Sequence, residues 1–274
     1  MALDVAVLLS IGRHPASGRS RRADLDARAL ELALRLGPEL RLHAIHAGDP
    51  AEPALSDYLG MGLETLTVLR QQPGADALPA LADHLAALKP GLVLAGLAAE
   101  AGEGSGMLPY LLAQRLGAAL LPAMAEASLA GPSFTGPSLA GQGIAGLQAL
   151  PRGRRRRLAA GLPAVLTVDR AAVPGRQSAF ARARAGRVVT IEAPPAPHAA
   201  GVREVPARPK PRRLKIATGG SAAERLRAAT EMQAGRGQLL VQPTPEAAAE
   251  AILDYLVKEG ILSAPTLAGP DARD

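Results

Sequence analysis

The stretch Val5–Leu36, VAVLLSIGRHPASGRSRRADLDARALELALRL, determines how this chain of 274 residues should fold. It begins with the unbroken apolar run Val5–Leu9, which is typical of a parallel strand covered on both faces. A loop rich in Gly, Arg and Ser follows at Gly12–Arg22. Apolar residues at helical spacing come after Asp24, which we expect to cap the helix, and a Gly-Pro pair ends the pattern. The stretch therefore predicts a strand, a loop and a helix, which together make one unit of a parallel sheet.

The same alternation continues as far as Gly117. We expect further strands and helices in turn, at Leu40–His46, Pro53–Met61, Thr65–Leu69, Asp76–Leu88, Leu92–Ala95 and Pro109–Leu116. Because strands and helices alternate, we predict an α/β fold with a parallel sheet and helices on both faces. Ligands of such sheets bind beyond the carboxyl ends of the strands. The loops Ser10–Arg22 and Gly96–Leu108, which leave two strand ends, therefore form the candidate ligand site.

The second half of the chain has a different composition. Gly131–Arg157 is rich in Gly, Pro and Ser, so we expect an irregular or antiparallel insertion at about residues 131–160. A strong strand follows at Leu162–Val168. We expect this strand to complete an α/β domain that spans residues 1–190.

Residues 191–274 are expected to form an arm. Prolines crowd Glu192–Arg213 and favour extended chain over regular structure. Two helical segments follow at Ser221–Gln233 and Pro245–Gly260, and the second begins with the capping sequence Thr244-Pro245-Glu246. Such an arm cannot form a core by itself, so we expect it to wrap a partner or the main domain.

The composition excludes several classes of function. The chain has no Cys, which excludes disulfides, thiolate metal sites, iron–sulfur clusters and a cysteine nucleophile. It has only three Tyr, two Phe and no Trp, which argues against nucleic-acid binding by base stacking. The amino terminus lacks a basic segment and no apolar stretch reaches the about 20 residues of a membrane helix. We therefore expect a cytoplasmic protein.

A glycine-rich loop carries the clearest ligand signal. Gly102, Gly104 and Gly106 would let the backbone approach a ligand closely, and a helix follows at once. A helix start offers free N–H groups that suit a phosphate. The pattern is neither a Walker A loop nor a dinucleotide fingerprint, so the alternative is a flexible surface loop.

Basic clusters are the other candidates for binding. The run Arg152–Arg157 contains five Arg, and we interpret it as a solvated turn in preference to a nucleic-acid site. A second cluster includes Arg182 and Arg184, and either docks an acidic protein surface or is plain solvated chain. The five His are scattered, and His43 and His46 point to opposite faces of one predicted strand. We find neither a catalytic constellation nor a metal site, which favours a binding or carrier protein.

The ordered set of motifs resembles the electron transfer flavoprotein beta subunit. The segment Leu162–Val168, LPAVLTV, is similar to that family's signature, and Gly96–Gly117, GLAAEAGEGSGMLPYLLAQRLG, resembles its adenylate-binding loop and helix. Asp26–Ala33 resembles the segment DxxALExA of the family. Further similarities lie at Gly60-Met61-Gly62, Arg182-Ala183-Arg184 and Ala248–Leu262.

The resemblance implies a function. It implies an adenine-nucleotide hydrolase-like (Rossmann-like) domain, with a C-terminal extension that embraces an alpha subunit. The family is a heterodimeric electron carrier, not an enzyme. FAD lies mainly in the alpha subunit, and AMP has a structural role in the beta subunit. Electrons pass from a flavin-dependent dehydrogenase to a membrane quinone oxidoreductase, and no nucleic-acid partner is expected.

The resemblance also implies site residues. The positions expected to bind cofactor are Leu8, Ala23, Asp24, Leu25, Asp26, Gly96, Gly102, Glu103, Gly104, Ser105, Gly106, Met107 and Leu108. The positions expected to dock a redox partner are Gln177, Phe180, Arg182 and Arg184.

The sequence departs from the family pattern at both sites. Ala23-Asp24-Leu25-Asp26 stands where the family has Asn-Pro-aromatic-Asp, and Met107 stands where it has Gln. The docking segment lacks the family's Leu, in whose region Gln177 or Phe180 falls. We therefore expect a divergent member whose donor is not an acyl-CoA dehydrogenase. The alternatives are a stand-alone nucleotide-binding regulatory protein of the same superfamily and an RNA-associated protein that uses the Arg152–Arg157 run.

Overall fold

The computed structural model describes residues 2–102, 104–130, 142–194, 221–223, 226, 240–258 and 262. The chain divides into two units, Met1–Glu204 and Val205–Asp274, which are described separately. Within the described part of the chain, every helix is too short or too polar to cross a membrane.

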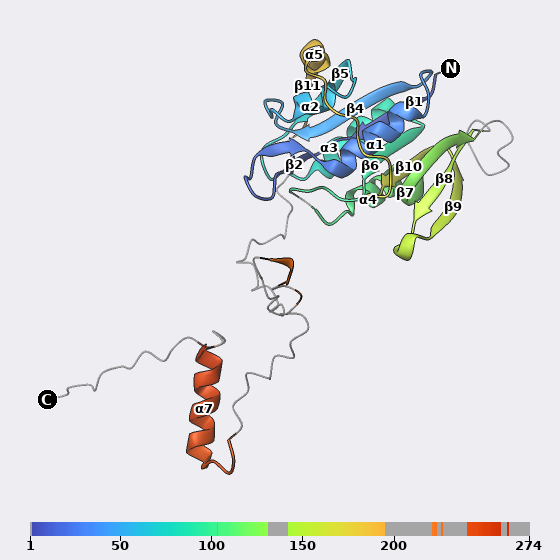
Figure 1. The fold of residues 1–274 in the computed structure, drawn as a ribbon. Coiled ribbons are helices and arrows are strands. Elements are labelled where there is room, and N and C mark those ends of the chain that lie inside the picture. Colours follow the sequence, from blue (N-terminus) through green and yellow to red (C-terminus); the bar gives the residue numbers. More distant parts are fainter. Residues whose placement is uncertain are drawn as a thin grey trace. The chain divides into compact units, whose positions relative to one another are not determined.

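A nine-stranded sheet forms the first unit (Figure 1). Its strands, in spatial order, are β11 (Arg187–Glu192), β5 (Thr65–Arg70), β4 (Arg41–Gly48), β1 (Asp4–Leu8), β6 (Leu92–Gly96), β10 (Ala164–Val168), β7 (Ala119–Ala130), β8 (Gly143–Ala149) and β9 (Arg155–Gly161). Pairing is parallel from β11 to β7 and antiparallel from β7 to β9. The predicted α/β fold with a mainly parallel sheet is therefore confirmed.

Helices cover both faces of the sheet. The helices α1 (Asp24–Arg35) and α2 (Leu55–Leu59) contribute Leu30 and Tyr58 to one core cluster, together with Val5 and Val7 of β1. The helices α3 (Ala77–Leu88) and α4 (Leu108–Leu116) contribute side chains to a second cluster on the other face. Successive side chains of β1 enter the two clusters in turn, so every residue from Val5 to Leu8 is buried and must be apolar.

The start of α1 differs from the prediction. Ala23, in extended conformation, is the N-cap and has no side-chain capping bond, so the expectation that Asp24 caps the helix is wrong. Asp24 is the first helical residue, and its carboxylate accepts a hydrogen bond at 3.0 Å from Nε of Arg28, one turn later. The helix α3 begins one residue later than the expected start at Asp76, which is its N-cap: Asp76 Oδ1 accepts from the Leu78 N–H at 2.9 Å.

Three extended elements were missed by the sequence reading. A small hairpin, β2 (Ile11–Arg13) with β3 (Ser20–Arg22), lies inside the loop after β1. The long strand β7 reaches from the parallel to the antiparallel part of the sheet. The strand β11 is exposed along its length and pairs with β5 at the edge. None of the three has the continuous apolar run of a central strand. The strands β2 and β3 have three residues each and pair locally with each other, whereas β7 and β11 pair with the distant strands β10 and β5.

The described part of residues 131–160 is antiparallel. The strands β8 and β9 form a hairpin closed by η1 (Pro151–Gly153), and Figure 1 shows this hairpin at the opposite end of the sheet from β11 and α5 (Phe180–Ala185). Residues 131–141 lie outside the described residues.

The second unit contains α7 (Pro245–Lys258). Thr244 Oγ1 accepts from the Ala247 N–H at 3.3 Å, in agreement with the predicted helix start. The proline-rich segment from residue 195 onward and most of the predicted helix Ser221–Gln233 lie outside the described residues. The proposed division into a domain over 1–190 and an arm over 191–274 stays a prediction.

Candidate functional site

The strands β1 and β6 lie side by side at the centre of the sheet, where the strand order changes direction. After β1 the chain proceeds to β4 and β5 on one side, and then returns to place β6 on the other side of β1. Such a reversal leaves a crevice beyond the carboxyl ends of the two strands. Leu8 ends β1 and Gly96 ends β6, so the two loops predicted to form the site leave neighbouring strand ends.

A hollow lies at the other end of the strands. It encloses about 490 Å³ and is lined mainly by apolar residues, including Leu3, Leu162 and Pro163. The hydrogen-bonded carboxylates of Asp26 and Glu100 lie instead at the carboxyl ends of the strands. We therefore place the candidate functional site there.

Asp26 joins the two strand-end loops. The carboxylate, on the buried side of α1, accepts from the Ser10 N–H at 2.6 Å, from Ser10 Oγ at 2.5 Å and from the Gly96 N–H at 2.9 Å. Burial raises the pKa of Asp26, while the bonds from Ser10 and Gly96 act in the opposite direction. The side chain therefore fixes the backbone of both loops against the first turn of α1.

Gly96 is required by this arrangement. A Cβ at this position would lie 2.4 Å from Asp26 Oδ1 and 2.8 Å from the Cβ of Leu25, both too close for a real contact. The absence of a side chain lets the end of β6 meet the start of α1 directly.

The Tyr58 hydroxyl links the start of α1 to the loop after β1 by hydrogen bonds. It donates to the Ser10 carbonyl at 2.8 Å and accepts from the Ala23 N–H at 2.8 Å. The ring is fully buried, and burial raises the pKa of Tyr58 well above its ordinary value. The phenol is thus a neutral structural link at physiological pH.

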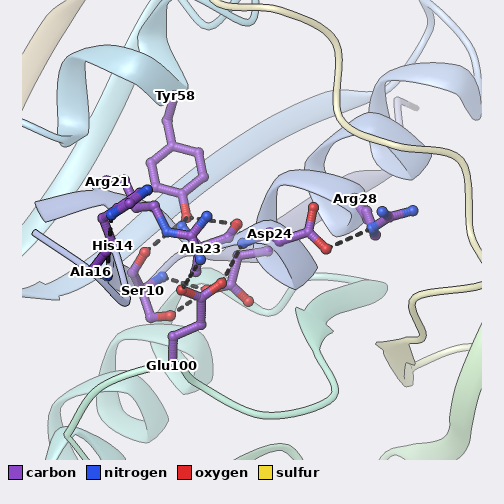
Figure 2. Close-up of polar contacts among 10 residues, drawn as sticks. Ser10, His14, Ala16, Arg21, Ala23, Asp24, Arg28, Tyr58 and Glu100 are labelled. Carbon is purple, nitrogen blue, oxygen red and sulfur yellow. Dashed lines mark hydrogen bonds and ion pairs between the residues drawn. The ribbon is translucent and has the colours of Figure 1, made fainter. Parts of the chain in front are cut away.

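Glu100 covers the N-terminus of α1 (Figure 2). Its Oε1 accepts from the Asp24 N–H at 2.9 Å, which satisfies one of the free N–H groups of the first helical turn. Its Oε2 forms an ion pair with the guanidinium of Arg21 at 2.9 Å. Three elements therefore meet at one carboxylate: the loop after β6, the β2–β3 hairpin and α1.

The predicted cofactor residues fall into two groups. The first group is Ala23, Asp24, Leu25 and Asp26 at the start of α1, where Leu25 and Asp26 lie against Gly96 at the end of β6. The second group is the glycine-rich loop, from Gly102 to Leu108 at the start of α4. Glu103 lies outside the described residues.

The loop of the second group is bent back on itself. Gly106 has a positive φ of 78°, and a Cβ there would lie 2.7 Å from the Leu97 carbonyl oxygen. Ser105 Oγ accepts from the Met107 N–H at 3.1 Å, and the Met107 side chain is half exposed. Gly106 therefore allows a close approach of the loop to its own backbone.

Sequence reasoning missed Ser10, Arg21, Tyr58 and Glu100. Ser10 and Arg21 lie within a loop that was predicted, but no pattern distinguishes them there. Tyr58 lies on α2, 48 residues beyond Ser10. The available signal was that it is one of only five aromatic residues in the chain. Glu100 is one of two acidic residues in a Gly- and Ala-rich loop, which was a usable but not a distinguishing signal.

The predicted docking residues lie on or near the short helix α5. The Phe180 side chain is 77% exposed, and the guanidinium of Arg184 lies 5.9 Å from its ring centroid. Arg182 and Gln177 are also exposed. The helix presents an apolar ring within a basic surface, which suits a protein partner.

Glu31 holds the segment that leads to α5. This buried carboxylate accepts from Arg176 through Nε at 2.7 Å, Nη2 at 3.2 Å and the backbone N–H at 3.3 Å. It also accepts from Nε of Arg35 at 2.7 Å. Burial alone would raise the pKa of Glu31, but these bonds lower it to about 2. Farther along, the Ala179 N–H donates to the Gly60 carbonyl at 3.0 Å, so the segment that carries α5 is fixed to the domain at two points.

The other candidates stay apart from this site. The run Arg152–Arg157 forms the exposed turn and first half of β9, and the ion pairs seen among the described residues include none of its arginines. His43 contacts Asp4 at 2.7 Å and His46 contacts the Leu9 carbonyl at 2.8 Å. Among the described residues, no cluster of acidic and His side chains is able to hold a metal ion.

The chain is similar to known proteins of one family. The family model described as the electron transfer flavoprotein domain matches residues 16–196. The chain is also 48% identical over 266 residues to a protein of Chromohalobacter salexigens called electron transfer flavoprotein subunit beta. That alignment covers 95% of this chain and 96% of the relative.

Proposed function

The chain belongs to the electron transfer flavoprotein family, in which its match is to a beta subunit, and we propose that it works as half of a heterodimer. In this proposal an alpha subunit holds most of the FAD, which carries the electrons. The present chain binds AMP in a structural role and helps to shape the flavin site. The observation that carries the proposal is the convergence of both strand-end loops on the start of α1, through Asp26 and Glu100.

The residues present fit a nucleotide. The Asp24 N–H and the Arg21 guanidinium are donors of the kind that bind a phosphate. Among the described residues, Nε of Arg21 is the one buried side-chain nitrogen or oxygen without a hydrogen-bond partner, so an acceptor is missing there. Leu8 and Gly96 would border the ligand at the strand ends, and the loop Gly102–Leu108 would close over it.

We propose a carrier and not an enzyme because the polar groups of this site are engaged with one another. Asp26 has three donors on its carboxylate, and the Tyr58 hydroxyl both donates and accepts. Neither is free to act as a general base or a nucleophile. Their role is to hold backbone, which suits a binding subunit.

The surface of α5 is proposed to receive the redox partners. Phe180 and its flanking Arg182 and Arg184 would dock a flavin-dependent dehydrogenase, and Glu31 would keep the helix in place. The same carrier would deliver electrons to a membrane quinone oxidoreductase from the cytoplasm.

Co-expression with a neighbouring candidate alpha subunit tests the proposal. We expect a soluble complex with the absorbance of an oxidised flavin, and an extract that contains both FAD and AMP. A chain that is stable and monomeric alone, that binds ATP tightly and that yields no flavin with any alpha subunit would contradict the proposal. That result would favour the stand-alone nucleotide-binding regulator.

A further inference from the structure

The helix α5 has no packed face of its own to hold it in place. It has six residues, Phe180–Ala185, and none of them is buried. A helix this short is not stable in water by itself, and helices in proteins are held mainly by the packing of an apolar face. The position of α5 must therefore come from contacts at its two ends.

The chain that enters α5 lies directly on Gly60, at the end of α2. The Ala179 N–H donates to the Gly60 carbonyl at 3.0 Å. A Cβ at Gly60 would lie 1.9 Å from Ser178 Oγ, 3.0 Å from Ser178 Cβ and 3.1 Å from the Ala179 nitrogen. Gly60 is buried and has φ −61° and ψ −17°, which is an ordinary helical conformation for any residue. The space, and not the backbone conformation, therefore requires a glycine here.

The chain that leaves α5 meets the same part of the domain at Gly186. A Cβ at Gly186 would lie 2.9 Å from Cδ2 of Leu59 and 3.1 Å from the Leu63 carbonyl oxygen. The next N–H, that of Arg187, donates to the Glu64 carbonyl at 2.9 Å. Figure 1 shows α5 beside α2 and β5, in agreement with the contact between α2 and α5. We call residues 59–64 the seat of α5, because both ends of the helix rest on them.

We propose that Gly60 and Gly186 are positioning residues for the docking of redox partners. Their missing side chains let both ends of α5 lie close to the seat, and this closeness sets where the exposed Phe180 ring and its flanking arginines are presented. The proposal rests on the proposed function, since it assumes that partners dock on α5.

The test measures how well the assembled heterodimer accepts electrons from the flavin-dependent dehydrogenase that reduces the wild-type complex. Carrier concentrations are taken from flavin absorbance, so that only flavin-loaded protein is counted. In Gly60→Val the KM for the carrier should rise about tenfold, because a displaced aromatic anchor costs an interface this much or more. Gly60→Ala should raise the KM in the same direction but less, and Gly186→Ala should do so from the other end of the helix. The kcat and the rate of reduction by dithionite should stay as in wild type, since neither needs a docked α5.

A second-site variant separates positioning from general damage. Ser178 is exposed and supplies the two atoms closest to a new methyl at Gly60. Adding Ser178→Gly to Gly60→Ala removes both atoms and should return the KM to within about twofold of wild type, a coupling that residues in contact show. Ser178→Gly alone is the matched control and should have the KM of wild type.

Hydrogen exchange reports on the helix directly. The N–H groups of Ala183 and Gly186 donate to the carbonyls of Ala179 and Arg182 at 2.9 and 3.0 Å. These amides should exchange faster in Gly60→Val than in wild type, because a helix without its seat opens more often. Amides in β1, at the centre of the sheet, should exchange as before.

The possible failures are distinct. If Phe180→Ala raises the KM and Gly60→Val does not, the positioning role is wrong while the docking surface stands. A Gly60→Val complex that loses flavin or kcat at an unchanged KM would also overturn the proposal, since the glycine would then act on the cofactor site. If Phe180→Ala leaves the KM unchanged, docking on α5 is itself wrong, and the inference is refuted with it.

Discussion

Replacing Glu31 by Gln should destabilise the first unit by about 3 kcal/mol at neutral pH. The carboxylate is 3% exposed and accepts four hydrogen bonds, three from Arg176 and one from Arg35. These bonds lower the pKa of Glu31 from an ordinary value of 4.5 to about 2. Each unit of pKa shift corresponds to about 1.4 kcal/mol, which gives the expected loss.

The sign of the pH dependence follows from the lowered pKa. A carboxylate with a lower pKa in the folded state stabilises that state fully above its unfolded value of 4.5. The stabilisation is lost as the pH falls toward 2, where the folded carboxylate takes up a proton. Because Gln resembles the protonated acid, the difference between wild type and Glu31→Gln should shrink from about 3 kcal/mol at pH 7 to about 1.4 kcal/mol at pH 3.

Urea unfolding of both proteins, followed by circular dichroism between pH 7 and pH 3, measures this difference. Glu64→Gln is the matched control, because Glu64 is exposed and its change should cost less than about 0.5 kcal/mol. Limited trypsin digestion adds a local measure, since loosening the Arg176 segment should speed cleavage at Arg182 and Arg184. A Glu31→Gln protein within about 0.5 kcal/mol of wild type at pH 7, or a difference that stays constant with pH, would refute the reasoning.

Other changes test the remaining parts of the structure. Tyr58→Phe should cost about 1–3 kcal/mol in urea unfolding, because the Ser10 carbonyl and the Ala23 N–H lose their buried partner; an unchanged midpoint would contradict this role. Gly96→Ala should cost about 1–3 kcal/mol and lower AMP content, because its methyl would lie 2.4 Å from Asp26 Oδ1; a normal variant would show that the contact relaxes easily. Phe180→Ala should leave stability within about 0.5 kcal/mol, since the ring is 77% exposed, but slow flavin reduction by the partner dehydrogenase in stopped-flow assays; unchanged reduction would place docking elsewhere.

The fold was largely predictable because its signals are local. The unbroken apolar run of β1 can only be covered on both faces, and the Asp76 cap and the Gly117 stop bound their helices through neighbouring residues. The edge strand β11 was not predictable in this way. Its side chains are all exposed, and only pairing with β5, far away in the sequence, makes it a strand.

The candidate site was predictable as a place but not as a set of contacts. Both loops that form it were identified, because the order of strands and helices determines where strand ends meet. The hydrogen-bond partners of the individual residues could not be identified from the sequence. Asp24 was expected to cap α1, but Ala23 takes that position, and Asp24 is free to pair with Arg28.

The sequence by itself determined the α/β class, the two loops and the family, since each depends on residues close together in the chain. The tertiary structure alone decided which groups meet. Asp26 bonds the Gly96 N–H across 70 residues, Glu100 reaches the Asp24 N–H across 76, and Arg176 pairs with Glu31 across 145. Local sequence restricts backbone conformation, whereas contacts at such separations exist only after the sheet has brought its strand ends together.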